Sequence, residues 1–235
     1  MMSFDSSQAF NRFSHAVGRR CSIDLRALAV FRMAIAAILL VDLLGRARNL
    51  AIFYTDSGVL PRRALASDYS SVYSIHTLSG DAWFQGLLFA IAAVFALMLL
   101  IGYRTRIATL ISWLLLLSLQ ARNPMVLHSG DHLLGLLLFW SLFLPLGERW
   151  SLDADRSDRD RSTVTSIAAV GLLIQVLLVY VTNAVHKSRS EVWLNGEALP
   201  MVYEADHYTI LLGNTLASYP EILEWFTVAW TWLLF

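Results

Sequence analysis

Hydrophobic residues gather in six runs along the chain, and polar or turn-like stretches separate them. The runs cover residues 27–44, 84–101, 107–119, 132–146, 164–186 and 222–235. An α-helix rises about 1.5 Å per residue, so about 20 apolar residues cross a hydrocarbon core about 30 Å thick. The third and fourth runs are shorter, which predicts helices that are tilted or packed inside a bundle. The pattern therefore predicts an all-α fold, a polytopic transmembrane helical bundle of about six spans.

Composition agrees with this class and excludes others. Hydrophobic residues make up 57% of the chain and charged residues only 15%, with a formal net charge of zero. The basic residues are scattered, whereas a nucleic-acid binder gathers them on one face, so the expected partner is the lipid bilayer and no nucleic acid. Cys21 is the only cysteine, which excludes an intrachain disulfide and a cysteine-based zinc cluster. We expect no metal.

Residues 1–22 precede the first run and show no cleavable signal peptide. Phe10, Phe13 and Val17 would share one helical face, which predicts an amphipathic helix on a membrane surface; a disordered leader is the alternative. The predicted organisation is an interfacial segment, 1–22, followed by a transmembrane domain, 23–235. The last run is still apolar at Phe235, so we expect the domain to be truncated at its C-terminus.

Basic residues in the loops indicate an orientation. With six crossings, ten lysines and arginines fall on the side of the N-terminus and seven on the other. Because cytoplasmic loops carry an excess of Lys and Arg, this predicts a cytoplasmic N-terminus in the cell (inner) membrane. The loops 50–83 and 122–131 and the end of the fifth run would then lie together on the non-cytoplasmic side.

Two charged residues lie within the first run, where a central charge costs about 3 kcal/mol. Arg32 and Asp42 are ten positions apart, or about 15 Å along a helix, so they cannot pair with each other. We expect both to find partners on other helices or at the interface.

The fifth run carries polar residues near its end. Tyr180, Asn183 and Lys187 lie within about 60° of one another on one helical face, and His186 belongs to a second polar stripe. A membrane helix with two such stripes is expected to face a cavity or polar helices.

Lys187 is the only lysine among eighteen basic residues. Arginine stays charged at any reachable pH, whereas a desolvated lysine can lose its proton and act as a base. Chemistry that needs a neutral amine can therefore use only Lys187. The alternative is structural, because a cation at a helix C-terminus complements the helix dipole and reaches the membrane surface.

Five strings resemble, in order, the HTTM domain that is shared with vitamin K-dependent gamma-glutamyl carboxylases. They are residues 53–62, 102–106, 129–134, 144–153 and 179–196. The resemblance extends over about 23–235 and implies a carboxylase-like enzyme of the lyase class that oxidises a reduced, vitamin K-like quinone. A Lys-Lys pair of the carboxylases matches His186-Lys187, and its second lysine, the family's catalytic base, falls on Lys187.

The same resemblance implies a pocket around this pair. Its expected wall residues, besides Tyr180 and Asn183, are His128, Asp131, His132 and Trp193. One departure is clear, because Gly130 stands where the carboxylases carry a functional histidine. His128 and His132 flank that position, where a hydrogen-bonded turn, a proton relay and a metal site are the alternatives.

Two functions follow from these features. The first is a membrane enzyme in which Lys187 acts as a base on a lipid-soluble quinone or a similar amphiphile. The acceptor substrate of this enzyme is a secreted peptide or protein or another molecule. The second is a non-catalytic membrane scaffold for the maturation or export of a secreted peptide.

Overall fold

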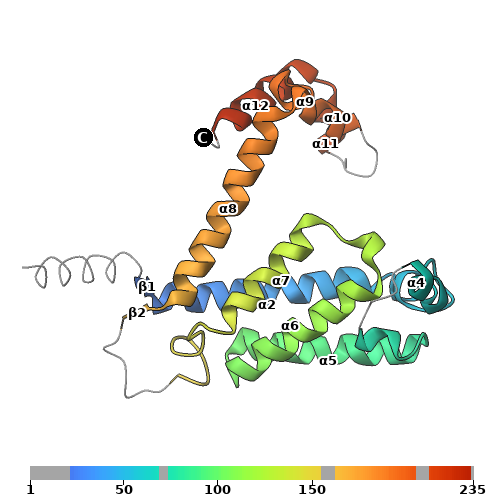
Figure 1. Ribbon diagram of the computed structural model, residues 1–235, viewed down its shortest axis with the longest axis vertical. Helices are drawn as coiled ribbons and strands as arrows, with labels where there is room; N and C mark the ends of the chain where they lie inside the picture. Colours follow the sequence, from blue (N-terminus) through green and yellow to red (C-terminus); the bar gives the residue numbers. More distant parts are fainter. Residues whose placement is uncertain (1–21, 69–73, 155–161, 205–211, 234–235) are drawn as a thin grey trace, which may run out of the picture. The chain divides into compact units, whose positions relative to one another are not determined.

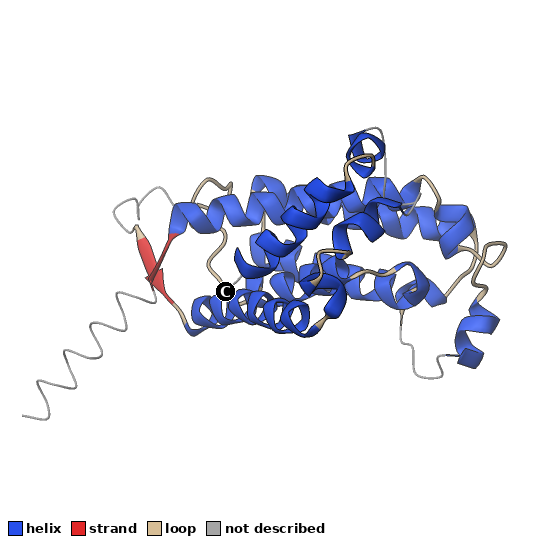
Figure 2. Ribbon diagram, turned by 90° about the horizontal axis from the view of Figure 1, so that it is seen from above, coloured by secondary structure: helices blue, strands red, loops and turns tan. Residues whose placement is uncertain are grey.

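The structure is a computed structural model that describes residues 22–68, 74–154, 162–204 and 212–233 (Figure 1). Its contacts divide the chain into two compact units, Met1–Gly171 and Leu172–Phe235. The predicted interfacial segment, residues 1–22, lies outside the described residues except for Ser22. Helices make up 75% of the structure (Figure 2). The expected all-α architecture is therefore confirmed.

Each of the six hydrophobic runs forms a helix. They are α2 (Leu25–Ala47), α5 (Ala82–Ile101), α6 (Thr105–Arg122), α7 (Ser129–Ser141), α8 (Ile167–Arg189) and α12 (Pro220–Leu233). By length and composition, α2, α5 and α8 are the described helices able to cross a membrane. Helix α7 has 13 residues and α12 has 14, so each is about 20 Å long and shorter than the hydrocarbon core.

The first unit is built around α2, α5, α6 and α7, whose buried apolar faces form one core. Ile35 and Leu39 of α2 pack there with Leu99, Leu116 and Leu138 of the other three helices. Short helices join them: α3 (Leu50–Tyr54), α4 (Arg62–Asp68), and the 3₁₀ turns η1 (Ile75–Thr77) and η2 (Pro124–Val126).

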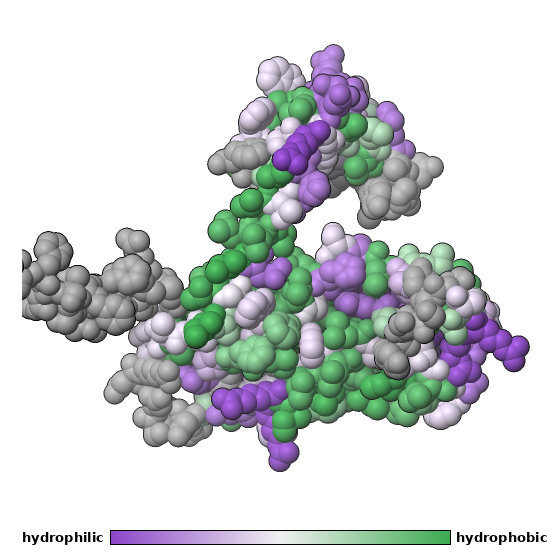
Figure 3. Space-filling view, in the orientation of Figure 1, coloured by the Kyte–Doolittle hydropathy of each residue, from purple (hydrophilic) through white to green (hydrophobic). Residues whose placement is uncertain are grey.

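The outer faces of these helices are hydrophobic as well (Figure 3). Val41 and Leu44 of α2 are 70% and 67% exposed, and Val94 and Leu97 of α5 are 54% and 48% exposed. A water-soluble helix would place polar side chains at such positions. Exposed apolar side chains on both helices indicate contact with lipid.

One two-stranded sheet among the described residues departs from the predicted pattern. Strand β1 (Ser22–Asp24) pairs antiparallel with β2 (Thr163–Thr165), with Ile23 opposite Val164. The fifth run was predicted to begin its helix at 164, but α8 begins at Ile167. The β-branched Thr-Val-Thr sequence favours a strand, and the Ser166 hydroxyl accepts a hydrogen bond from the Ala168 amide at the start of α8.

Arg32 lies fully buried on α2 and binds backbone carbonyls. Its guanidinium donates to the carbonyl oxygens of Leu146 and Trp150, in the loop that follows α7. The expectation that Arg32 finds its partners elsewhere in the bundle is confirmed. This contact fastens the loop to the first half of the first spanning helix.

The second unit consists of most of α8 and four shorter helices. The short helices are α9 (Glu191–Leu194), α10 (Ala198–Glu204), α11 (Leu212–Ala217) and α12. Thr227 of α12 is buried, and its hydroxyl accepts a hydrogen bond from the Leu199 amide of α10. Leu223 of α12 is buried as well, so these helices share a small core of their own.

Candidate functional site

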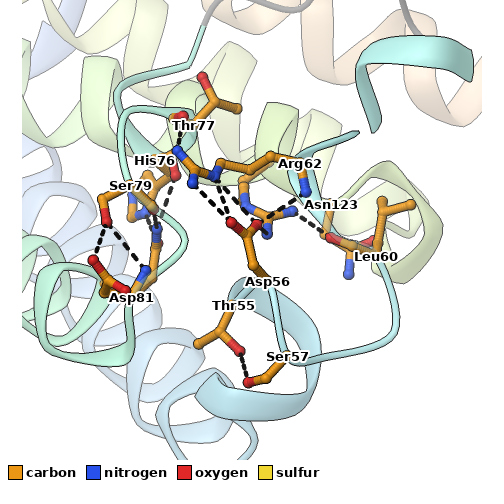
Figure 4. Close-up of polar contacts among 12 residues, drawn as sticks. Thr55, Asp56, Ser57, Leu60, Arg62, His76, Thr77, Ser79, Asp81 and Asn123 are labelled. Carbon is orange, nitrogen blue, oxygen red and sulfur yellow. Dashed lines mark hydrogen bonds and ion pairs between the residues drawn. The ribbon is translucent and has the colours of Figure 1, made fainter. Parts of the chain in front are cut away.

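Polar side chains gather in the loops at one end of the first unit, with Asp56 at their centre (Figure 4). Arg62 donates to the Asp56 carboxylate through Nε at 2.9 Å, and Arg122 Nη2 lies 3.8 Å from the same carboxylate. Arg62 also donates to the carbonyls of Thr77 and Leu78. Asp56 therefore joins Arg62, at the start of α4, to Arg122 at the end of α6, and Arg62 joins this pair to the segment 77–78.

Two features fix the position of Asp56. Its amide donates to the carbonyl of Gly80 at 3.0 Å, and a Cβ on Gly80 would lie 2.0 Å from the Asp56 carboxyl carbon. Only glycine fits there. The hydrogen bond from Arg62 is the largest influence on the pKa of Asp56, which lies below its usual value, so the carboxylate is charged at neutral pH.

Arg122 lies behind this cluster at the end of α6 and is fully buried. Its Nη1 donates to the carbonyl of Leu60 at 2.9 Å, while Nε and Nη2 make no hydrogen bond in the described structure. Charge attraction to Asp56 is thus its main compensation for burial.

His76 lies in η1 and is 2% exposed. Its ring Nδ1 is 2.7 Å from Oε1 of Gln85, whose Nε2 donates to the carbonyls of His76 and Ser79. Burial lowers the pKa of His76, and the charge of Arg122 lowers it further, so the ring is neutral at neutral pH.

A second charged cluster joins α2, α3 and α7. Arg46 donates to both carboxylate oxygens of Asp42, to the Tyr54 hydroxyl and to the carboxylate of Asp131. Asp42 was expected to find a partner on another helix or at the interface, and its partner is Arg46, one turn further along α2 and in the last turn of that helix. A spacing of four residues places the two side chains side by side, and the end of the helix makes this possible without a charge at mid-span.

Asp131 and His128, two of the expected wall residues, begin α7. The His128 ring accepts from the Gly130 amide, and the Asp131 carboxylate accepts from the His128 amide at 2.9 Å. This is a reciprocal capping arrangement. It matches the hydrogen-bonded turn among the predicted alternatives. In the part of the chain that the structure describes, no group of three His, Cys, Asp or Glu side chains is placed to hold a metal ion.

His132, the third expected residue of this region, lines a shallow groove between α6 and α7. The groove has a volume of about 440 Å³, and Trp113, Leu117 and Phe139 form its apolar walls. Gln120 lies at the same groove and donates to the carbonyl of Asp131. The groove is therefore apolar along most of its length and polar where His132 and Gln120 meet it.

Lys187 and Trp193 contact each other in the second unit. The Lys187 amine lies 3.9 Å from the centre of the Trp193 ring, in cation–π geometry. Ser190 begins α9, the turn that carries Trp193 back toward the end of α8. The contact places these two predicted site residues together.

The other predicted residues of α8 lie along its exposed surface. Tyr180 and Asn183 are exposed, and the Asn183 amide donates to the carbonyl of Val179 within its own helix. His186 is exposed next to Lys187. The expected residues of α7 belong to the first unit and those near the end of α8 to the second.

Sequence reasoning missed the cluster around Asp56 and the contact between His76 and Gln85. Asp56 and Arg62 occur in the string 53–62 that carried the family resemblance, yet no spacing rule predicted their pairing. Arg122 and Gln85 carried a usable signal, since both are polar residues at the ends of apolar runs.

Comparison with known proteins gives one match. A family model described as the HTTM domain matches residues 21–235, nearly the whole chain. No curated protein and no solved structure matches the chain.

Proposed function

The chain belongs to the HTTM domain family, and from this membership we propose a carboxylase-like integral membrane enzyme that uses Lys187 as a base. The HTTM domain is related to the membrane domains of vitamin K-dependent carboxylases. The proposed substrate is a lipid-soluble reduced quinone or a similar amphiphile. The observation that carries the proposal is the amine of the sole lysine, held at the end of an apolar helix with no carboxylate partner among the described residues.

The surroundings of Lys187 support this role. Among the described residues, no carboxylate lies within ion-pair distance of its amine, and its one recorded contact is the Trp193 ring. A lysine committed to structure commonly pairs with Asp or Glu. Here the ring of Trp193 orients the amine and leaves its donors free for a substrate oxygen.

The cation–π contact also sets a condition for catalysis. The ring attracts the ammonium more strongly than the neutral amine, so the contact favours the protonated form of Lys187. To act as a base, Lys187 must first lose the proton of its ammonium form and move away from the Trp193 ring. An apolar substrate bound at this place would displace the ring and exclude water, and both changes favour the neutral amine.

The groove beside His132 fits an amphiphile of the proposed kind. Its volume of about 440 Å³ is in the range of small-molecule sites, and Trp113 and Phe139 offer flat surfaces to a ring. His132 and Gln120 would meet a polar substituent. When bound, a reduced quinone would supply, with oxygen, a base stronger than any side chain.

The position of Gly130 bears on the last step of the family's reaction. Gly130 replaces the family histidine, and the His128 ring uses Nδ1 to accept from the Gly130 amide. The imidazole nitrogens nearest to this position in the sequence are Nε2 of His128 and both ring nitrogens of His132. We propose that one of them acts where the carboxylases use their histidine.

Localisation in the cell (inner) membrane with a cytoplasmic N-terminus is part of the same proposal. The basic residues of the loops support it through the ten-to-seven count. A secreted peptide or protein would then meet the enzyme on the non-cytoplasmic side.

Oxidation of a reduced naphthoquinone by the protein in lipid tests the enzyme. We expect Lys187→Ala and Lys187→Arg to lose it, since neither supplies an amine that can be neutral. A swap variant, Lys187→Arg with Arg189→Lys, keeps one lysine but moves it two positions, and we expect it to be inactive as well. Equal oxidation by all four proteins would reject the lysine base and favour the scaffold for peptide maturation or export.

A further inference from the structure

A small cavity lies inside the first unit, between α2, α5 and α6. Its volume is about 20 Å³, and most of its lining is apolar, including Leu39, Leu88, Phe89 and Leu116. Three polar residues share this lining: Asp42, His76 and Ser112. An apolar cavity stays dry, whereas a cavity with several polar groups binds water. The polar groups therefore decide what the cavity holds.

The hydrogen bonds of Gln85 determine which nitrogen of His76 carries the proton. Both hydrogens of the Gln85 amide nitrogen are used, one by the carbonyl of His76 and one by that of Ser79. The oxygen of Gln85 must then face the His76 ring, and an oxygen can only accept. Nδ1 of His76 therefore carries the hydrogen, and Nε2 presents a bare lone pair.

Ser112 and Asp42 supply complementary groups. The Ser112 hydroxyl, on α6, is buried and makes no hydrogen bond in the described structure. Asp42 accepts hydrogen bonds from Arg46 at both oxygens, and a carboxylate has about four acceptor positions. The cavity thus has two acceptors, His76 Nε2 and Asp42, and one donor, Ser112.

We infer that this cavity is an internal water site in which one water donates to His76 Nε2 and to Asp42 and accepts from Ser112. A cavity needs about 10–15 Å³ to hold a water, and buried waters make about three hydrogen bonds. The volume meets the first requirement, and the three polar residues of the lining can supply the partners for the second. The water would satisfy the Ser112 hydroxyl, which is otherwise unpaired in the core, and would donate to the lone pair of His76 Nε2.

The water site has a consequence for the packing of the first unit. It connects His76 of η1 and Gln85 of α5 with the cluster of Asp42, Arg46 and Asp131 that joins α2 and α7. The water would therefore bring the lone pair of His76 Nε2 and the Asp42 carboxylate into one hydrogen-bonded network inside the bundle.

Nitrogen NMR of the protein labelled at histidine, in lipid nanodiscs, tests the tautomer. We expect one buried histidine with hydrogen on Nδ1 and a bare Nε2, and its signals should vanish in His76→Gln. Water contact at this ring, seen as magnetisation transfer from water, is the expected second signal. Hydrogen on Nε2, or a ring without water contact, would overturn the proposal.

Two substitutions of Ser112 give an independent test through the melting temperature. Ser112→Val fills the cavity with apolar atoms and expels the water, so we expect the melting temperature to fall by several degrees. Ser112→Ala leaves room for the water and should melt within a degree or two of the native protein. A rise in Ser112→Val would show a dry cavity that gains from filling, and it would reject the water site.

Discussion

Arg46 at the end of α2 donates a hydrogen bond to the carboxylate of Asp131 in the first turn of α7, although 85 positions separate the two residues. Both side chains are nearly buried, at 11% and 3% exposure. Breaking a buried ion pair leaves the remaining charge uncompensated, which makes this contact a sensitive point of the first unit.

Removal of either partner should destabilise the bundle. We expect Arg46→Met to lower the free energy of unfolding by about 3 kcal/mol, because it leaves Asp42 and Asp131 without their shared cation. Asp131→Asn should cost less, since its amide oxygen can still accept from the His128 amide. Unfolding in detergent measures both, and the double variant should cost clearly less than the sum. Additive losses would mean that the two residues are not coupled.

The close packing of Gly102 against Arg32 gives a second prediction about stability. Gly102 has a φ of 76°, and a Cβ there would lie 2.2 Å from Nη1 of Arg32. We expect Gly102→Ala to lower stability by at least about 2 kcal/mol through backbone strain and displacement of the guanidinium. Gly45→Ala is the matched control, because no atom lies within 4 Å of its Cβ position, and alanine should stabilise α2 by about 1 kcal/mol. Similar losses in both variants would contradict this account.

The Lys187–Trp193 contact predicts the reactivity of the amine. Because Lys187 is the only lysine, an amine-specific reagent labels it and the N-terminus, and peptide mass spectrometry separates the two sites. Loss of the aromatic ring in Trp193→Leu should raise the labelling rate of Lys187 about two- to fivefold, since a cation–π contact contributes about 0.5–1 kcal/mol. The labelling rate of Lys187 in Trp193→Phe should lie between the rates in the native protein and in Trp193→Leu. Trp225, a highly exposed tryptophan of α12, supplies the control, and an effect of Trp225→Leu equal to that of Trp193→Leu would remove the specificity.

His76 predicts how stability depends on pH. Burial lowers its pKa in the folded protein, so the unfolded chain takes up a proton first as the pH falls. The stabilising contribution is complete above the ordinary value of about 6.5 and is lost as the pH falls from there toward the folded pKa. Melting temperatures should therefore drop between about pH 7.5 and 5.5, and His76→Gln should flatten the drop. An unchanged slope in this variant would assign the dependence to other groups.

The helices of the fold could be predicted because each is encoded in its own short stretch. The run of apolar residues at 84–101 predicts α5 nearly to the residue, and Gly102 marks its end. The pair of β1 and β2 could not be predicted, because a three-residue strand has no pattern of its own and depends on a partner about 140 positions away.

The candidate site was predictable to a smaller extent. Lys187 stands out because it is the only lysine of the chain. Trp193, which its amine contacts, follows it by only six positions in the sequence. The contacts of Asp56, Arg46 and His76 join segments that come together only when the bundle packs. Asp131 illustrates the limit, because the sequence marked it as a polar residue of interest but gave no sign that its partner is Arg46.

Arg32 carries a consequence for how the protein is made. Its partners, the carbonyls of Leu146 and Trp150, follow it by 114 and 118 positions. During synthesis α2 reaches the membrane long before that loop exists, so the bilayer must accept an unpaired guanidinium at about 3 kcal/mol. Insertion of the first helix is thus provisional, and the ribosome must deliver α5, α6, α7 and the loop before that charge has its place.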